Sequence, residues 1–280
     1  MFEPLDLTIA IPARNEEQNL KLCIESIGTD FARHIVIIDS QSTDATSQIA
    51  SSYDVEVINF AWNGMFPKKR NWYLRNHTPA TKWVLFLDAD ECLTPAFKTE
   101  VRKKIMDNQV TGYWLSYSVF FMGAVMKGGY PLRKLALFQV GKGEYEQINE
   151  ERWSKLDMEI HEHPVLSGRT GVIQSKIDHR DYRGVSHYIT KHNEYSDWEA
   201  RRYSRIIADE LLVRNWTWKQ KIKYKLMGSI FLGPAYFLGS LIFLGGFRDG
   251  SRGFTFAILK MSYFTQIYCK LKESGTSHKK

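Results

Sequence analysis

The chain has 280 residues, of which 44% are hydrophobic, and a formal charge of +7. This length and apolar content allow a sizeable buried core and exclude a disordered protein. Its three cysteines are widely separated, which excludes a disulfide framework and indicates a reducing compartment. The positive charge favours anionic partners: nucleotides, phospholipid headgroups or nucleic acid.

In the first 110 residues, short apolar runs alternate with helical patterns. Asn15 and Gln18 resemble a capping box for the first helix, and Thr94 is a good N-cap for the last. Strand-then-helix units predict an α/β fold with a mostly parallel, doubly wound sheet. The expected strands are residues 7–11, 34–39, 55–60 and 83–87, and the expected helices lie within 15–27, 42–52, 67–77 and 94–108.

Beyond residue 110 the pattern changes to strands and loops, with strands expected at 113–122 and 132–140. A polar, largely helical stretch follows from 185 to 225 and ends in a basic run. We therefore predict an α/β half at 1–110, a β and loop part of the same domain at 111–184, and a helical region at 185–280.

The helical region contains an apolar segment, Leu226 to Phe247, that has no formally charged residue. Pro234 lies at its middle, and basic residues flank it on both sides, which argues against a single membrane crossing. Residues 253–272 suit a helix lying in the membrane interface. We expect a monotopic or peripheral membrane anchor that binds anionic lipid at the cytoplasmic face, because the N-terminus lacks a signal-peptide pattern. The alternative is a buried helical subdomain of a soluble protein.

The position of the basic residues also argues against nucleic acid as a binding partner. They cluster beside the apolar tail, where anionic lipid is the simpler partner.

Polar clusters follow three of the expected strands, at Pro12–Glu16, Asp39–Asp44 and Asp88–Glu91. Ligands of such sheets bind beyond the carboxyl ends of the strands, so these clusters should converge. Asp88 and Asp90 offer hard oxygen ligands for Mn²⁺ or Mg²⁺. The alternative is that these acids only cap and solvate the next helix.

These segments, together with Lys69-Arg70-Asn71, resemble the nucleotide-sugar domain of glycosyltransferase family 2, which has the GT-A fold. The resemblance covers roughly residues 5 to 110 and is closest to bacterial members that add hexoses to lipopolysaccharide core or other envelope glycans. It implies a metal-dependent inverting transfer from a nucleotide sugar to a lipid-linked or envelope-glycan acceptor. Residues 1–110 would then bind the nucleotide sugar, and residues 111–184 would form the acceptor side.

The resemblance also assigns residues to the nucleotide sugar. Asp39 would contact the base, which favours a UDP-hexose because a carboxylate suits the uracil N–H, although Asp39 can instead cap the turn before Thr43. Lys68 and Lys69 can be a solvated helix start. The implied nucleotide-sugar residues are Pro12, Ala13, Glu16, Asp39, Arg70 and Asp88.

For the metal and the base, the resemblance implies further residues. Asp88, Asp90 and, as a late ligand, His179 would hold the ion, and Arg133 or Lys134 can assist the leaving diphosphate. Glu162 would be the base that takes the acceptor proton, with Glu159 and Asp157 as rivals. The pair His161 and His163 can alternatively be read as part of a zinc cluster.

Two other functions remain open from the sequence. A nucleotidyltransferase shares the sheet and the metal-binding aspartate, but Pro12–Glu16 lacks the Gly-rich phosphate loop usual in that class. A non-catalytic, sugar-nucleotide-binding membrane protein is the other alternative.

Overall fold

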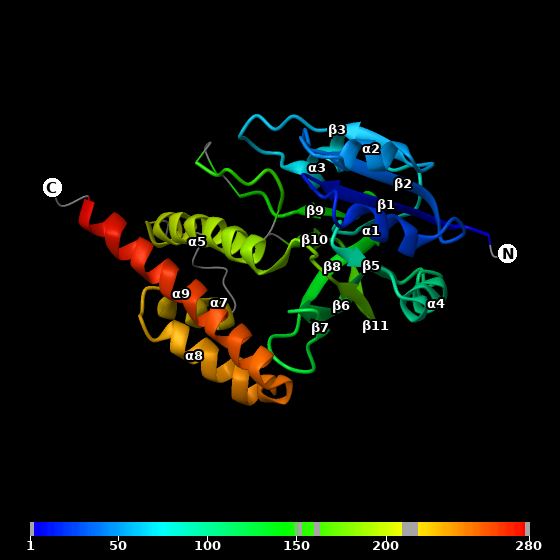
Figure 1. Cartoon of the computed structure of the whole chain (residues 1–280). Helices are drawn as coiled ribbons and strands as arrows, with labels where there is room; N and C mark the ends of the chain where they lie inside the picture. Colours follow the sequence, from blue (N-terminus) through cyan, green and yellow to red (C-terminus); the bar gives the residue numbers. More distant parts are fainter. Residues whose placement is uncertain (1–2, 149, 151–152, 160–162, 209–217, 278–280) are drawn as a thin grey trace. The chain divides into compact units, whose positions relative to one another are not determined.

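The computed structural model describes residues 3–148, 150, 153–159, 163–208 and 218–277. The chain forms two compact units (Figure 1), and each is described by itself. Unit 1 comprises Met1–Phe120 and Leu132–Tyr182, and unit 2 comprises Phe121–Pro131 and Arg183–Lys280. The sequence had placed 121–131 in the acceptor-side part, whereas this segment belongs to unit 2.

The first half of the sheet in unit 1 is parallel, and its strands appear where the apolar runs predict them. β1 pairs with β2 and with β4, and β2 pairs with β3. All four residues of β4 are buried, as expected for a strand covered on both faces. The bounds are β1 (Leu5–Ala13), β2 (Ala32–Asp39), β3 (Glu56–Asn59) and β4 (Trp83–Phe86).

The second half continues the same sheet in the order β3-β2-β1-β4-β8-β6-β11-β5. β8 is antiparallel to β4 and β6, whereas β11 is parallel to β6. The predicted α/β fold with a mostly parallel sheet is therefore confirmed. The remaining strands of this sheet are β5 (Glu91–Cys92), β6 (Val110–Phe121), β7 (Ala124–Val125), β8 (Arg133–Gln139) and β11 (Arg169–His179). A separate two-stranded antiparallel sheet consists of β9 (Gly143–Tyr145) and β10 (Pro164–Leu166).

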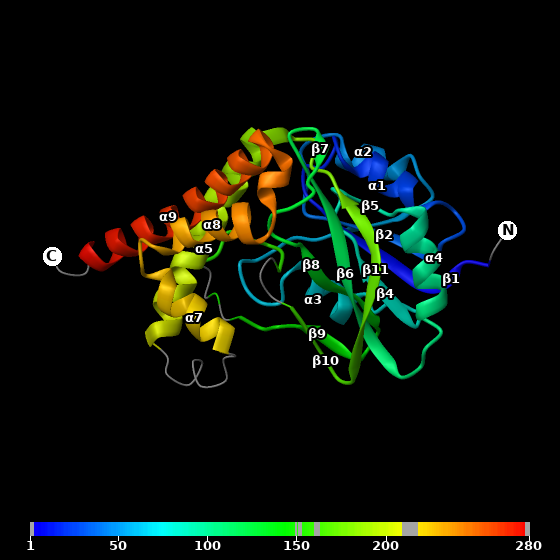
Figure 2. The ribbon, with the colours of Figure 1, turned by 90° about the horizontal axis from the view of Figure 1, so that it is seen from below.

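Helices cover both faces of this sheet (Figure 2). α1 (Leu20–Ile27), α2 (Thr46–Ser51) and α4 (Pro95–Lys104) contribute to one apolar core, and α3 (Lys69–Asn76) contributes to the other. Alternate residues of a strand point to opposite faces, so Ile9 and Ile11 join the first core while Ala10 joins the second. Because the two cores cover the two faces of the sheet, the polar strand ends lie at the edge of the sheet between them.

The two predicted helix caps have different outcomes. Thr94 is the N-cap of α4, and its hydroxyl accepts a hydrogen bond from the Phe97 N–H at 3.2 Å, which confirms the prediction. The capping box of Asn15 and Gln18 is wrong, because α1 begins at Leu20. Asn15 instead has a φ of 54°, and its side-chain oxygen accepts the Thr43 N–H at 2.9 Å. A side chain used to join two loops is not available to cap a helix.

Unit 2 is helical. α5 and α8 pack along α9, with buried residues such as Met227, Leu232 and Ile267 between the helices (Figure 1). The segment 226–247 is divided among short helices, including a π-helix that begins at Gly239. None of the described helices combines the length and apolar character that a bilayer crossing requires. The bounds are α5 (Gly184–Ala208), α7 (Trp218–Met227), α8 (Leu232–Leu238), η1 (Gly239–Phe243), η2 (Gly246–Asp249) and α9 (Ser251–Ser277).

The segment Phe121–Pro131 is bound to these helices by backbone contacts. The Asp249 carboxylate accepts hydrogen bonds from the backbone N–H groups of Lys127 and Gly128 at 2.9 to 3.0 Å. A Cβ on Gly128 would lie 2.1 Å from the Gly245 carbonyl oxygen, so the close approach requires glycine there.

Candidate functional site

The loops that follow β1 and β2 are bound to each other at the carboxyl end of the sheet. Asn15 N–H donates to the Ser42 hydroxyl at 2.9 Å, and Glu16 N–H donates to the Thr46 hydroxyl at 2.7 Å. Ala13 lies beside Asp39 in the parallel register. The structure thus brings Pro12, Ala13, Glu16 and Asp39 to one rim, as the strand ends predict.

Asp39 is 2% exposed, and its carboxylate is bound within its own turn. It accepts hydrogen bonds from the hydroxyls of Ser42 at 2.5 Å and Ser47 at 3.0 Å. The turn-capping arrangement that the sequence left open is therefore present. The Ser42 backbone N–H also donates to both carboxylate oxygens at 3.3 Å, so a backbone group as well as two hydroxyls holds Asp39 in the turn.

At the start of α3, the basic residues are buried rather than solvated. The ammonium of Lys69 donates to the Ala13 carbonyl at 3.1 Å and lies 3.4 Å from the Asp157 carboxylate. Lys68 pairs with Glu150, and the side chains are 6% and 4% exposed. The interpretation of Lys68 and Lys69 as a solvated helix start is wrong.

Glu159 caps the same helix. Its two carboxylate oxygens accept the backbone N–H groups of Arg70 and Asn71 at 3.0 and 3.1 Å. Burial raises its pKa, opposed by the Arg70 charge and these N–H groups. A negative group is favourable at a helix N-terminus, so Glu159 positions α3.

Arg70 connects this helix start to the predicted metal site. Its guanidinium donates to the Asp88 carboxylate at 2.6 Å and also to the Glu159 carbonyl oxygen. It lies over the Tyr145 ring, 5.3 Å from the centroid. Burial tends to lower the pKa of Arg70, but Tyr145, Asp88 and Glu159 outweigh it, so the guanidinium stays charged.

Asp88, Asp90 and Glu91 gather beyond the end of β4, because the chain makes a turn there in which the Glu91 N–H donates to the Asp88 carbonyl at 2.9 Å. Leu87 and Ala89 belong to the first apolar core, and the acids lie between and after them. Each acid offers a carboxylate oxygen, and these atoms all lie within 4.8 Å of one another. Such a set of hard donors fits Mn²⁺ or Mg²⁺.

Glu91 is fully buried, and its carboxylate accepts the Asp88 N–H at 3.1 Å. Burial raises its pKa, with Asp88 and Asp90 acting in the same direction and Lys134 opposing them. Glu91 thus orients the turn that carries Asp88.

Lys134 supplies the positive charge for this cluster. Its ammonium donates to Asp88 and to Glu91, each at 2.5 Å. The prediction from the sequence was that either Arg133 or Lys134 assists the leaving diphosphate. In the structure Arg133 is exposed, while Lys134 reaches the acids. Its pKa is raised well above the usual value, since Asp88 and Glu91 outweigh the opposing effect of burial.

His179, the predicted late ligand, also reaches the cluster. In the register of β11 with β5 it lies opposite Glu91, and its Nε2 is 3.6 Å from an Asp90 carboxylate oxygen. The Arg180 N–H donates to the Asp90 carbonyl at 2.8 Å, which holds the two strands together. A histidine 89 positions beyond Asp90 in the sequence thus adds an imidazole nitrogen to the carboxylates.

The predicted base, Glu162, lies outside the described residues, as does His161. His163 is described, and its ring lies 5.9 Å from the Trp114 ring. Among the described residues, the group that could hold a metal ion is Asp88, Asp90 and Glu91, so nothing there supports a zinc cluster at His163.

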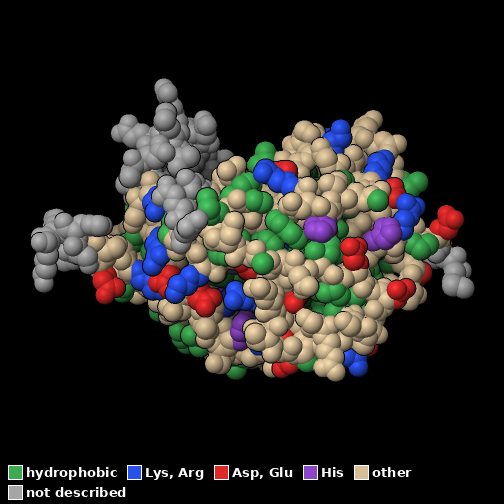
Figure 3. Space-filling view, turned by 90° about the horizontal axis from the view of Figure 1, so that it is seen from above, with side chains coloured by type: hydrophobic (Ala, Val, Ile, Leu, Met, Phe, Trp, Pro, Cys, Tyr) green, Lys and Arg blue, Asp and Glu red, His purple; other side chains and the backbone are tan. Residues whose placement is uncertain are grey.

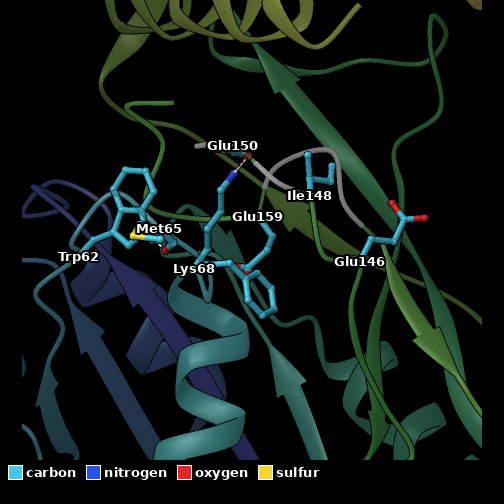
Figure 4. A pocket seen from close by; sticks show the side chains of 8 residues that line it. Trp62, Met65, Lys68, Glu146, Ile148, Glu150 and Glu159 are labelled. Carbon is cyan, nitrogen blue, oxygen red and sulfur yellow. Dashed lines mark hydrogen bonds and ion pairs between the residues drawn. The ribbon is translucent and has the colours of Figure 1, made fainter. Parts of the chain in front are cut away.

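A pocket lies next to the start of α3 (Figure 4). The Lys68–Glu150 pair crosses it, and Trp62 lies against Met65, whose carbonyl accepts the indole N–H at 2.7 Å. Its lining residues are Trp62, Met65, Phe66, Lys68, Glu146, Ile148, Glu150 and Glu159.

Tyr117, Tyr145 and Glu150 were not predicted as site residues from the sequence. Tyr117 lies under the Lys134 ammonium at 5.1 Å, Tyr145 lies under Arg70 at 5.3 Å, and Glu150 pairs with Lys68. An aromatic residue in a strand predicts burial only, and no local pattern indicates which distant cation it meets. The pairing of β6 with β8 brings Tyr117 to Lys134, whereas the packing of α3 against β9 brings Arg70 to Tyr145.

Comparison with known proteins identifies relatives. The chain is 28% identical over 276 residues to the lipopolysaccharide core biosynthesis glycosyltransferase LpsC of Rhizobium meliloti, covering 94% of this chain and 90% of the relative. It is 32% identical over 99 residues to the glycosyltransferase SunS of Bacillus subtilis, covering 35% of this chain and 23% of that protein.

Among solved structures, the crystal structure of glucosyl-3-phosphoglycerate synthase from Mycobacterium tuberculosis, in complex with Mn²⁺, UDP and phosphoglyceric acid, matches with 20% identity and a TM-score of 0.33. The match covers 42% of this chain and 44% of that protein, so the chain spans under half of its length.

The sequence profile described as Glycosyl transferase family 2 matches residues 8–160, which contain both rim loops, α3 and the acid cluster. This match spans more than half of the chain and therefore establishes that the protein belongs to glycosyl transferase family 2 and is a glycosyltransferase.

Proposed function

We propose that the enzyme transfers a hexose from a nucleotide sugar, a UDP-hexose, to a hydroxyl of a lipid-linked or envelope-glycan acceptor. One observation carries the proposal: at the end of β4, Asp88 and Asp90 lie together with Arg70, Lys134 and His179. Family membership supports sugar transfer rather than nucleotidyl transfer. The similarity to LpsC along 94% of the chain supports an acceptor of the lipopolysaccharide-core type.

In this proposal, Asp88, Asp90 and His179 hold Mn²⁺ or Mg²⁺. When bound there, the ion would supply positive charge for the departing diphosphate. Arg70 holds Asp88 in place through a 2.6 Å hydrogen bond and adds positive charge on the nucleotide side. The donor set of carboxylates and one imidazole supports the assignment.

Pro12, Ala13, Glu16 and Asp39 form the proposed nucleoside site. A carboxylate accepts hydrogen bonds only, which complements the N–H of uracil. The Ser47 hydroxyl that binds one Asp39 oxygen can rotate away, and a carboxylate oxygen can accept a further hydrogen bond from the base beside that of the Ser42 N–H. This chemistry supports UDP as the nucleotide.

Glu162 is the proposed base, which takes the acceptor proton while the hydroxyl oxygen attacks the anomeric carbon. A single displacement of this kind inverts the configuration of the sugar. The rival carboxylates have other partners, since Asp157 lies beside Lys69 and Glu159 caps α3. These contacts support Glu162 over both rivals.

Unit 2 is the proposed membrane anchor, which would place the enzyme at the cytoplasmic face. Several apolar side chains of 226–247 are exposed, including Phe231 at 74%, Phe243 at 85% and Phe247 at 62%. Exposed patches of large apolar side chains mark interaction sites. Arg248 and Arg252 lie beside them and are exposed, which suits anionic lipid headgroups.

The charge distribution of unit 2 supports one lipid-facing region. Toward the C-terminus, basic and acidic side chains lie close together (Figure 3), and Lys270 pairs with Asp197 at 2.7 Å. By contrast, 226–247 has no acidic residue.

The test of the metal-dependent transfer is Asp90→Asn. This change removes a charged ligand but keeps the side-chain size, so we expect Mn²⁺-dependent transfer from UDP-hexose to a core-oligosaccharide lipid to fall at least about a hundredfold. The control is Asp54→Asn, which alters an exposed aspartate between α2 and β3. Full Mn²⁺-dependent activity in Asp90→Asn would refute the metal assignment.

A further inference from the structure

Both carboxylate oxygens of Asp88 are bound by cations of the protein itself. Arg70 donates to Oδ1 at 2.6 Å, and Lys134 donates to Oδ2 at 2.5 Å. The Lys134 ammonium also donates to Glu91 at 2.5 Å and so lies between two members of the acid cluster. The ammonium therefore occupies an oxygen that a metal ion at Asp88 would use.

This ammonium position is built by the fold. Lys134 projects from β8, and Tyr117 of the neighbouring β6 places its ring 5.1 Å from the ammonium. An aromatic face attracts a cation, and two carboxylates complete the position. The fully buried Glu91 needs such a charge, because an unpaired buried carboxylate is strongly unfavourable.

Two features suit an exchange of ligands at this position: the ammonium can leave, and a buried hydroxyl beside it can take a new partner. The Lys134 side chain is 28% exposed, and a lysine has a flexible four-carbon stem with a single point charge. Tyr117 is 5% exposed, yet its hydroxyl has no hydrogen-bond partner among the described residues. A buried hydroxyl of this kind normally has a partner, so its place beside the acids suits a further ligand.

We propose that Lys134 and the divalent ion exchange at the acid cluster. Without metal, the ammonium neutralises Asp88 and Glu91. When the ion binds Asp88, it repels the ammonium, which turns to the diphosphate of the donor. Lys134 is then both a competitor of the metal and a diphosphate-binding residue. This inference rests on the proposed function, which supplies the ion and the diphosphate.

The exchange predicts effects of opposite sign for Lys134→Met. Mn²⁺ alone should bind more tightly, on the order of tenfold, because its competitor is gone. UDP should bind the Mn²⁺-loaded variant more weakly, also on the order of tenfold, because a positive charge for the diphosphate is lost. A lysine that only supports the fold would, when removed, weaken the binding of both Mn²⁺ and UDP, because the acids would lose their arrangement.

The experiment titrates the full-length protein with Mn²⁺ and follows the electron paramagnetic resonance signal of the free ion. UDP binding to the Mn²⁺-loaded protein is then measured by calorimetry. Lys134→Arg keeps the competing charge, so its Mn²⁺ affinity should not exceed that of the wild type. Lys142→Met removes an exposed lysine that follows β8 and should leave both affinities unchanged. If Lys134→Met loses the circular dichroism of the wild type, Lys134→Gln carries the same expectation.

The outcomes separate this inference from the proposed function. If the wild type binds Mn²⁺ and the neutral Lys134 variant binds it no more tightly, the exchange is overturned while the metal assignment stands. If neither protein binds Mn²⁺, with or without UDP, the metal assignment fails and the exchange fails with it. Tighter Mn²⁺ binding together with weaker UDP binding supports the exchange.

Discussion

Asp88 and Glu159 show how single carboxylates acquire different tasks at the same rim. Asp88 lies beyond the end of a buried strand and is shared by Arg70 and Lys134, with a side chain that is 22% exposed. Glu159 is 3% exposed, and both of its oxygens are used by backbone N–H groups. Because both oxygens of Glu159 already accept N–H groups at the start of α3, this carboxylate is poorly suited to take the proton of an acceptor hydroxyl. The hydrogen-bond partners thus show that Asp88 belongs to the proposed site, whereas Glu159 supports the helix beside it.

The base assignment is tested at the residue scale by Glu162→Gln. The amide keeps the shape of the side chain but does not accept the acceptor proton, so we expect the turnover number to fall by about 10²–10⁴. The Kd for UDP with Mn²⁺, measured by calorimetry, should stay that of the wild type. Glu146→Gln, in an exposed position of the pocket wall, is the control. An unchanged turnover number would return the role to Asp157 or Glu159.

At the scale of elements, the apolar runs and the Thr94 signal locate the strands and α4, because burial and capping are local properties. The pairing of β8 between β4 and β6, and of β11 with β5, is not local. This pairing carries Lys134 and His179 to the acids. The Asn15–Gln18 capping box was predicted wrongly for a similar reason, since the second loop binds Asn15.

The contribution of the Thr94 cap can be measured. Its hydroxyl accepts the Phe97 N–H and donates to the Lys176 carbonyl in β11 at 2.8 Å. Thr94→Ala should lower the free energy of unfolding by about 1–2 kcal/mol, the usual cost of a lost N-cap. Thr99→Ala removes an exposed hydroxyl within α4 and serves as the control. Equal midpoints of urea unfolding for the two variants would contradict the capping role.

At the scale of the whole molecule, two units divide the work in the proposed function. Unit 1 holds the rim loops, α3 and the acid cluster, and unit 2 carries the exposed apolar side chains. The segment 121–131 joins β6 to β8 along the chain yet belongs to unit 2. Unit 2 is therefore linked to the strand of Lys134 by only a few residues.

Membrane binding is tested by Phe243→Asp combined with Phe247→Asp. Burying a phenylalanine side chain contributes about 1.5–3 kcal/mol, so losing both should weaken binding to phosphatidylglycerol-containing vesicles at least about a hundredfold. Co-sedimentation with the vesicles measures this loss. Met106→Asp, which alters a 74% exposed methionine of unit 1, should bind like the wild type. Equal binding by both variants would show that this surface does not contact lipid.

The sequence by itself determined the α/β fold, the family and the acid motif, because apolar runs, strand ends and the spacing of Asp88 and Asp90 are written in adjacent residues. The family resemblance named Arg70, His179 and either Arg133 or Lys134, but only the tertiary structure decided which of these side chains reach the acids and what they contact there. Arg70, Lys134 and His179 reach the acids from α3, β8 and β11, and Tyr117 and Tyr145 lie under the cations. The physical reason is that strand register and helix packing join segments far apart in the chain, and no local pattern specifies that register.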